Sequence, residues 1–120
     1  MRKLADIRSE KARRHKKLMN SVELIRSRLI ELGAEKIVLF GSLARNEIDV
    51  ASDLDLLVVM PPGRSGKEWM GLIYEQVDRR LASDIIAYNR DEWEQELPVS
   101  RFLKNALASG RIIYEKNSSE

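Results

Sequence analysis

The sequence predicts an α/β (α+β) domain, in which helices pack on a small mixed β-sheet and a long helix comes first. Short apolar runs at about 36–40, 54–60 and 83–88 have the length and composition of buried strands. Around them, apolar residues recur every three or four positions, which is typical of helices with one face on a core. With 120 residues, 43% of them hydrophobic, the chain is long enough for one such core.

The first helix is predicted from a stripe of apolar residues spaced four, three, four and three positions apart: Leu18, Val22, Ile25, Leu29 and Leu32. Gly33 is well placed to end it, because glycine readily adopts the left-handed backbone of a helix C-cap. Its start has two alternatives. Asn20 and Glu23 could form a capping box, or the helix could run unbroken from near Arg2.

Residues 1–17 are expected to form a basic helical arm, ahead of a folded domain at 18–115 and a disordered tail at 116–120. The arm holds eight Lys or Arg against Asp6 and Glu10, a net charge of +6 in a chain whose total is +2. Such an arm could bind nucleic acid or an acidic partner, although charge runs are usually solvated surface. No aromatic residue interleaves it, which disfavours a single-strand-binding role.

The strand at Lys36–Phe40 runs into a Gly-Ser turn and a helix start. Gly41 lets backbone N–H groups approach an anion, and the positive end of the following helix favours a phosphate. Ser42 could cap that helix or donate its hydroxyl to a phosphate. Arg45, one turn later, could contact a phosphate or pair with a nearby carboxylate.

The strand at Leu54–Met60 opens on two carboxylates, Asp53 and Asp55. Because side chains alternate along a strand, these two point to the same face. Adjacent carboxylates near a sheet interior need a positive charge between them, and a divalent metal is the usual solution. A metal-binding carboxylate pair beside a phosphate-binding turn is typical of a site that transfers a nucleotide.

Pro61 and Pro62 end this strand, and residues 63–67 are predicted to form an exposed, flexible loop. This loop is not a P-loop, because Glu68 stands where that motif needs Ser or Thr. Arg64 could still meet a triphosphate from outside. A helix is expected at about Lys67–Leu81.

The last part of the chain alternates again between strand and helix patterns. A third strand is expected at Ser83–Tyr88, and a capping box at Asn89 predicts a short helix through Glu96. A helix at Ser100–Ser109 is expected to turn Phe102, Leu103, Ala106 and Leu107 inward, with Gly110 as its C-cap. Arg111–Tyr114 is expected to be an edge strand.

The two motifs around the first two strands resemble those of the nucleotidyltransferase superfamily, the DNA polymerase beta-like enzymes, and most closely the minimal nucleotidyltransferases. The family pattern is Gly-Ser-x-Ala-Arg after one apolar strand and Ser-Asp-x-Asp-Leu before the next. The chain has Gly41-Ser42-Leu43-Ala44-Arg45 and Ser52-Asp53-Leu54-Asp55-Leu56. Asn46 stands where the family often has Gly. The resemblance covers about 36–115 and implies the nucleotidyltransferase fold.

This resemblance also implies a set of site residues. The catalytic and metal-binding residues would be Asp53, Asp55 and Asp84. Asp84 matches the family's third carboxylate, which lies on a neighbouring strand. They would hold one or two Mg²⁺ ions, and Asp84 would help to deprotonate the acceptor hydroxyl. The residues that hold the nucleoside triphosphate, expected to be ATP, would be Gly41, Ser42 and, as a secondary contact, Arg45.

Members of this size resemble the antitoxins of two-gene toxin–antitoxin modules. The resemblance implies transfer of AMP to a tyrosine of a helical partner ribonuclease, a HEPN-type toxin. Two alternatives stay open: a non-catalytic antitoxin that masks its partner by docking, and a transferase for a small hydroxylated molecule. The chain could also form a homo-oligomer.

Two features of the composition indicate the compartment in which the protein works. The chain has no cysteine, so disulfide and thiol chemistry are excluded. Its apolar runs are far shorter than the roughly 20 residues needed to span a membrane, and the cytoplasm is the expected compartment.

Overall fold

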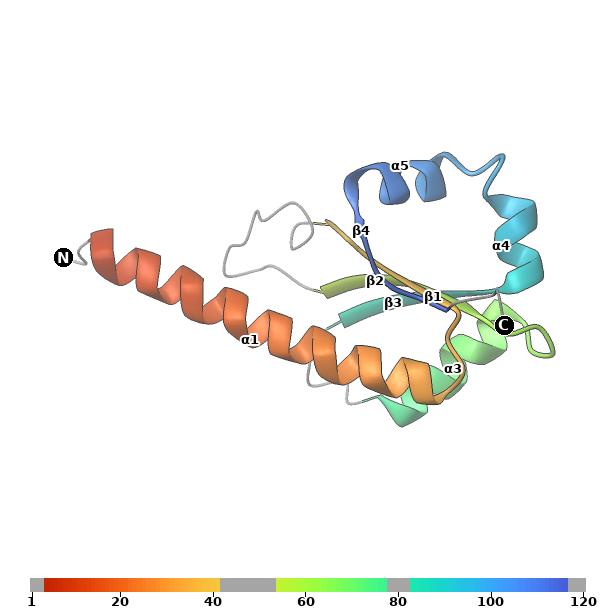
Figure 1. Cartoon of the computed structure of the whole chain (residues 1–120), viewed down its shortest axis with the longest axis horizontal. Helices are drawn as coiled ribbons and strands as arrows, with labels where there is room; N and C mark the ends of the chain where they lie inside the picture. The colour runs from red at the N-terminus through yellow and green to blue at the C-terminus, as the bar shows by residue number, and fades with distance from the viewer. Residues whose placement is uncertain (1–3, 42–53, 78–82, 117–120) are drawn as a thin grey trace.

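The computed structural model describes residues 4–41, 54–77 and 83–116, which form a mixed sheet with helices on both faces (Figure 1). The strands are β1 (Lys36–Phe40), β2 (Leu54–Met60), β3 (Ser83–Asn89) and β4 (Arg111–Glu115). The helices are α1 (Leu4–Glu31), α3 (Gly66–Gln76), α4 (Arg90–Glu96) and α5 (Arg101–Ser109). The predicted mixed architecture with a long first helix is therefore confirmed.

The sheet has the order β3-β2-β1-β4, with β4 at one edge as predicted. β1 runs antiparallel to both of its neighbours, whereas β2 and β3 are parallel. A parallel pair needs a crossover connection, and the segment between these strands contains α3. As a result, β2 and β3 both begin at the end of the sheet where β1 stops.

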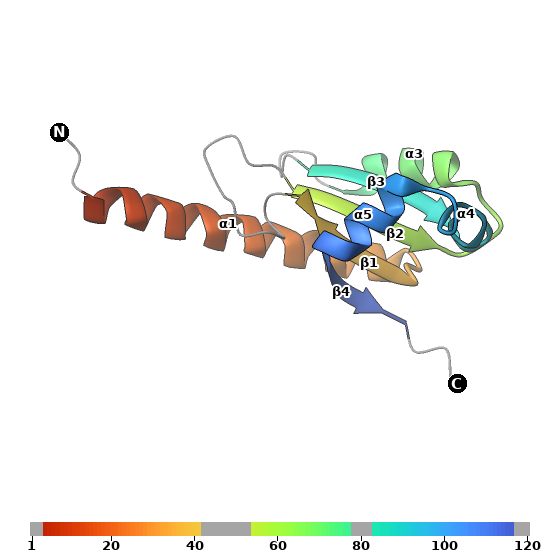
Figure 2. The same ribbon diagram turned by 90° about the horizontal axis from the view of Figure 1, so that it is seen from above.

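α1 runs unbroken from Leu4 to Glu31, so the second of the two predicted starts is correct and Asn20 does not begin the helix. Its apolar stripe is buried against the sheet at Leu18, Val22, Ile25 and Leu29. Gly33, with φ of 109°, ends it, and the N–H of Ala34 donates to the carbonyl of Leu29 at 3.0 Å. The first half of α1 extends past the end of the sheet at which β2 and β3 begin (Figures 1 and 2).

The alternation of side chains on the strands divides the core into two layers. One face of the sheet packs under α1 and α3, and its strand residues are Ile37, Leu39, Leu54, Leu56, Val58, Met60, Ile85 and Ala87. The opposite face packs under α4 and α5, and its buried strand residues are Val38, Leu57 and Val59. Because both faces of β2 are covered, its run of consecutive apolar residues is explained.

α3 begins one residue earlier than predicted and ends at Gln76, while the predicted end at Leu81 lies outside the described residues. Ser65 caps this helix in a capping box with Glu68, and Gly66 is buried. The segment predicted as an exposed loop therefore includes an ordered helix start. The capping boxes of α3 and α4, the second predicted at Asn89, fix where both helices begin.

One prediction about α5 is wrong. Leu103 and Ala106 face the core, but Phe102 is 44% exposed and contacts Phe40 through an edge-on ring contact. Phe102 lies on the flank of the apolar stripe, where the surface of the helix turns from the sheet toward solvent. Gly110 follows the helix as its predicted C-cap. Within the described ranges, no helix is both long and apolar enough to cross a membrane.

Candidate active site

Two of the predicted site carboxylates lie side by side at the end of the sheet where β2 and β3 begin. Asp55 is the second residue of β2 and Asp84 the second of β3, and the two are direct partners in the parallel register. On the other side, Asp55 is paired with Phe40, the last residue of β1. Neighbouring strands are about 5 Å apart, so these three residues form a row across the sheet.

All three members of this row belong to the same face. Asp55 alternates in step with the buried Leu57, and Phe40 and Ile86 pack against the same layer under α4 and α5. Asp84, two residues before Ile86, shares that face. Asp55 is half-buried and Asp84 is exposed, so the row opens to solvent at Asp84.

Gly41 closes the row where β1 ends. Its φ is 78°, a left-handed conformation that other residues adopt only with strain. A Cβ at this position would collide with Oδ2 of Asp55 and would lie only 3.1 Å from its Cγ. The Asp55 carboxylate therefore rests against the glycine backbone, and this contact requires the absence of a side chain.

Three predicted site residues, Asp53, Ser42 and Arg45, lie outside the described residues. What the described part brings together is Gly41, Asp55 and Asp84, which come from three different strands or strand ends. No group of three or more His, Cys, Asp or Glu able to hold a metal occurs among residues 4–41, 54–77 and 83–116. Of the three predicted metal ligands, Asp55 and Asp84 are the two that the structure describes.

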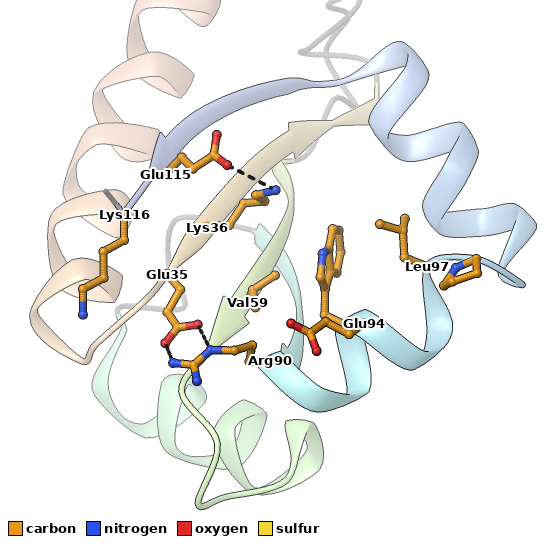
Figure 3. Close-up of a pocket in the computed structure, with 10 residues that line it drawn as sticks. Glu35, Lys36, Val59, Arg90, Glu94, Leu97, Glu115 and Lys116 are labelled. Carbon is orange, nitrogen blue, oxygen red and sulfur yellow. Dashed lines mark hydrogen bonds and ion pairs between the residues drawn. The ribbon is translucent and has the colours of Figure 1, made fainter. Parts of the chain in front are cut away.

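An open pocket of about 490 Å³ lies at the opposite end of the sheet, where β1 begins and β2 and β3 finish (Figure 3). It is lined by Glu35, Lys36, Val59, Arg90, Trp93, Glu94, Leu97, Pro98, Glu115 and Lys116. Nε of Arg90 donates to Oε1 of Glu35 at 2.8 Å, and its Nη2 pairs with Oε2. The hydrogen bond from Arg90 lowers the pKa of Glu35, against a smaller opposing effect of burial.

A second ion pair and a cation–π contact lie in the same pocket. Nζ of Lys36 lies 3.5 Å from Oε1 of Glu115 and 5.8 Å from the centre of the Trp93 ring. Arg64 follows β2 at this same end and stacks over Trp69 at 5.1 Å. It is separated from Asp55 by nearly the whole of β2, roughly 16 Å from Asp55 to Met60. Arg64 is therefore not placed to meet a phosphate at the carboxylates.

The family model of the nucleotidyltransferase domain matches residues 22–113, about three quarters of the chain. The chain belongs to the nucleotidyltransferase domain family. Its structure is similar to that of a candidate nucleotidyltransferase from Sulfolobus solfataricus, with a TM-score of 0.53 and 19% identity over 90% of this chain and 86% of the other. At this identity the likeness concerns the fold. No curated protein matches the chain.

The sequence motifs did not single out Phe40 as part of this nucleotidyltransferase site. The only signal was its place immediately before Gly41, at the end of an apolar strand. Its position opposite Asp55 follows from the antiparallel register, which sequence alone does not supply.

Proposed function

We propose that the protein transfers AMP from ATP, with Mg²⁺, to a hydroxyl group on a partner protein, in the way that antitoxin nucleotidyltransferases modify a tyrosine of a HEPN-type toxin. The observation that carries the proposal is the direct pairing of Asp55 with Asp84 beside Gly41. Adjacent carboxylates on neighbouring strands repel each other, so such an arrangement is favourable when a cation lies between them.

The two described carboxylates fit a hard divalent cation. Carboxylate oxygens are the ligands that Mg²⁺ prefers, and Asp84 is open to solvent, as a site that keeps water and substrate phosphates in the metal's coordination shell requires. Asp53, two residues before Asp55, would complete the set. When bound, the ion supplies positive charge that stabilises the developing negative charge on the triphosphate.

The chain's own residues would bind and orient the two substrates. Gly41 leaves room at the end of β1 for phosphate oxygens to approach the backbone, with Ser42 next to it as a hydroxyl donor. Asp84 is the candidate for taking the proton from the acceptor hydroxyl, because it is the exposed member of the pair. The acceptor oxygen then attacks the α-phosphorus, the bond to the bridging oxygen breaks, and pyrophosphate leaves.

A protein acceptor is favoured by the exposure of Asp84, the outer of the two described carboxylates. Asp84 is exposed, and the described 490 Å³ pocket, which could hold a small molecule, lies at the opposite end. A protein hydroxyl can reach an open site because the rest of the partner supplies binding energy elsewhere, whereas a small acceptor needs an enclosing pocket.

The test is transfer of α-phosphate label from ATP to the protein encoded by the neighbouring gene, with Mg²⁺ present. We expect label on a tyrosine of the partner and loss of at least about 100-fold in rate for Asp55→Asn, the scale of removing one transition-state charge stabiliser. Partner inhibition by an Asp55→Asn variant that no longer transfers label would instead indicate a masking antitoxin. Label transfer at the wild-type rate by Asp55→Asn would remove the proposed mechanism.

A further inference from the structure

The row of site residues does not end at the carboxylates. Phe40, on the other side of Asp55 from Asp84, continues it on the same face of the sheet. The ring of Phe102, from the first turn of α5, stands at 86° to the Phe40 ring with 5.7 Å between their centres. An aromatic pair drawn from β1 and α5 therefore borders the carboxylate site.

Core packing alone does not account for this pair. α5 anchors itself to the sheet through Leu103 and Ala106, which are 0% and 5% exposed. Phe102 is 44% exposed and Phe40 is half-buried, so the pair presents aromatic surface to solvent next to the site. An aromatic side chain held by a rigid neighbour and open to solvent is suited to stacking against a flat ligand.

We propose that Phe102, supported by Phe40, is the platform on which the nucleobase of the donor stacks. The inference rests on the proposed function, because it takes the triphosphate to lie at Gly41 and Asp55. One strand spacing plus the ring contact puts Phe102 roughly 10 Å from Asp55, a distance that the ribose and phosphate of a single nucleotide together can bridge.

The platform selects for the class of ligand rather than for one base. Every nucleobase has a π-face, so stacking tolerates all four, but purines offer the larger surface and are expected to bind more tightly. The donor is therefore a nucleoside triphosphate, with purines preferred, held at one end by phosphate contacts and at the other by an aromatic ring. Inorganic triphosphate has no base, so it should make only the phosphate contacts.

The test compares binding of two probes by the full chain with Mg²⁺: the non-cleavable analogue α,β-methylene-ATP and inorganic triphosphate. Phe102→Ala should weaken the analogue about 5- to 100-fold, the usual range for losing one stacked base, and leave the Kd of triphosphate unchanged. Phe102→Trp should restore analogue binding. Val99→Ala removes another exposed apolar side chain just before α5 (Val99 is 77% exposed) and should change neither Kd.

Three results would overturn the platform. Phe102→Ala could leave analogue binding intact, or weaken both probes equally, which would mean that the ring only supports the local structure. It could also lower label transfer to a partner with no change in analogue Kd, which would make Phe102 an acceptor contact. If the wild-type chain binds neither probe, the proposed nucleotide site and the proposed function are both wrong. If it binds both probes and Phe102→Ala changes neither Kd, the proposed function stands and only the platform is wrong.

Discussion

The two ends of the sheet differ in which charged side chains are neighbours. Where β2 and β3 begin, Asp55 and Asp84 are like charges on adjacent strands, against a glycine whose conformation keeps the space clear. Where these strands finish, Glu35 pairs with Arg90 and Lys36 pairs with Glu115. Among the described residues, the first end therefore brings carboxylates together and the second brings carboxylates to basic side chains.

This difference distinguishes an end suited to binding a cation from an end where Glu35 and Glu115 are already paired with basic side chains. Opposite charges in contact satisfy each other and leave little field to attract a substrate. Two carboxylates that lie side by side on neighbouring strands would both be stabilised by one cation bound between them. The 490 Å³ pocket is therefore not the end of the sheet at which we propose that a cation binds.

The largest expected effect comes from replacing Asp84. Asp84→Asn keeps the shape but removes the charge and the proton acceptor, and a positioned base is worth about 10²- to 10⁴-fold in rate. Label transfer should fall by that factor while the free energy of unfolding, measured with urea, changes little. Glu94→Gln removes an exposed carboxylate at the opposite end and should retain full activity. Equal losses for the two variants would erase the distinction between the ends.

Gly41→Ala should cost both stability and activity. The φ of 78° would strain an alanine by about 1–3 kcal/mol, and its Cβ would displace the Asp55 carboxylate. Gly63→Ala is the matched control, because Gly63 also has a positive φ, 116°, but a Cβ there meets nothing within 4 Å. Urea unfolding should show a loss for both, and only Gly41→Ala should lose label transfer. A Gly41→Ala variant with wild-type activity would mean that the glycine serves the backbone alone.

Glu35→Gln should lower the free energy of unfolding by about 0.5–1 kcal/mol and leave label transfer unchanged, because the two-point pair with Arg90 is partly exposed. Glu31→Gln breaks the pair with Arg28, in which the carboxylate is far more exposed, 64% against 15% for Glu35, and should cost less. If Glu35→Gln reduced transfer as strongly as Asp84→Asn, the paired end would have to be counted as part of the site.

The smallest effect is a pH dependence of that same pair. Arg90 lowers the pKa of folded Glu35 below its usual 4.5, so its stabilising contribution is fully present above that value and is lost as pH falls through the lowered pKa. The difference in unfolding free energy between wild type and Glu35→Gln should therefore be constant from neutral pH down to about 5 and shrink in more acidic solution. A difference that grew on acidification would contradict the assigned pairing.

Local patterns were sufficient for most of the secondary structure. The prediction was correct for the β1 and β2 ranges, the capping box at Asn89 and the glycine end of α1, because each depends on residues within one turn or one strand. The prediction for Phe102 was wrong because helical periodicity gives the direction of a stripe but not how far it stays in contact with the sheet. The roles of Asp53, Ser42 and Arg45 stay predictions from the family pattern.

By itself, the sequence determined the family, the identity of the candidate carboxylates and the turn that precedes them, since these are encoded in motifs of five consecutive residues. Only the tertiary structure decided that β2 and β3 are parallel neighbours with Asp55 opposite Asp84, and that Phe40 and Phe102 border them. The physical reason is register: strands separated by a crossover can pair in several offsets, and a slip of one residue would turn a carboxylate to the other face. Packing of both faces of β2 selects the single offset in which the charges meet.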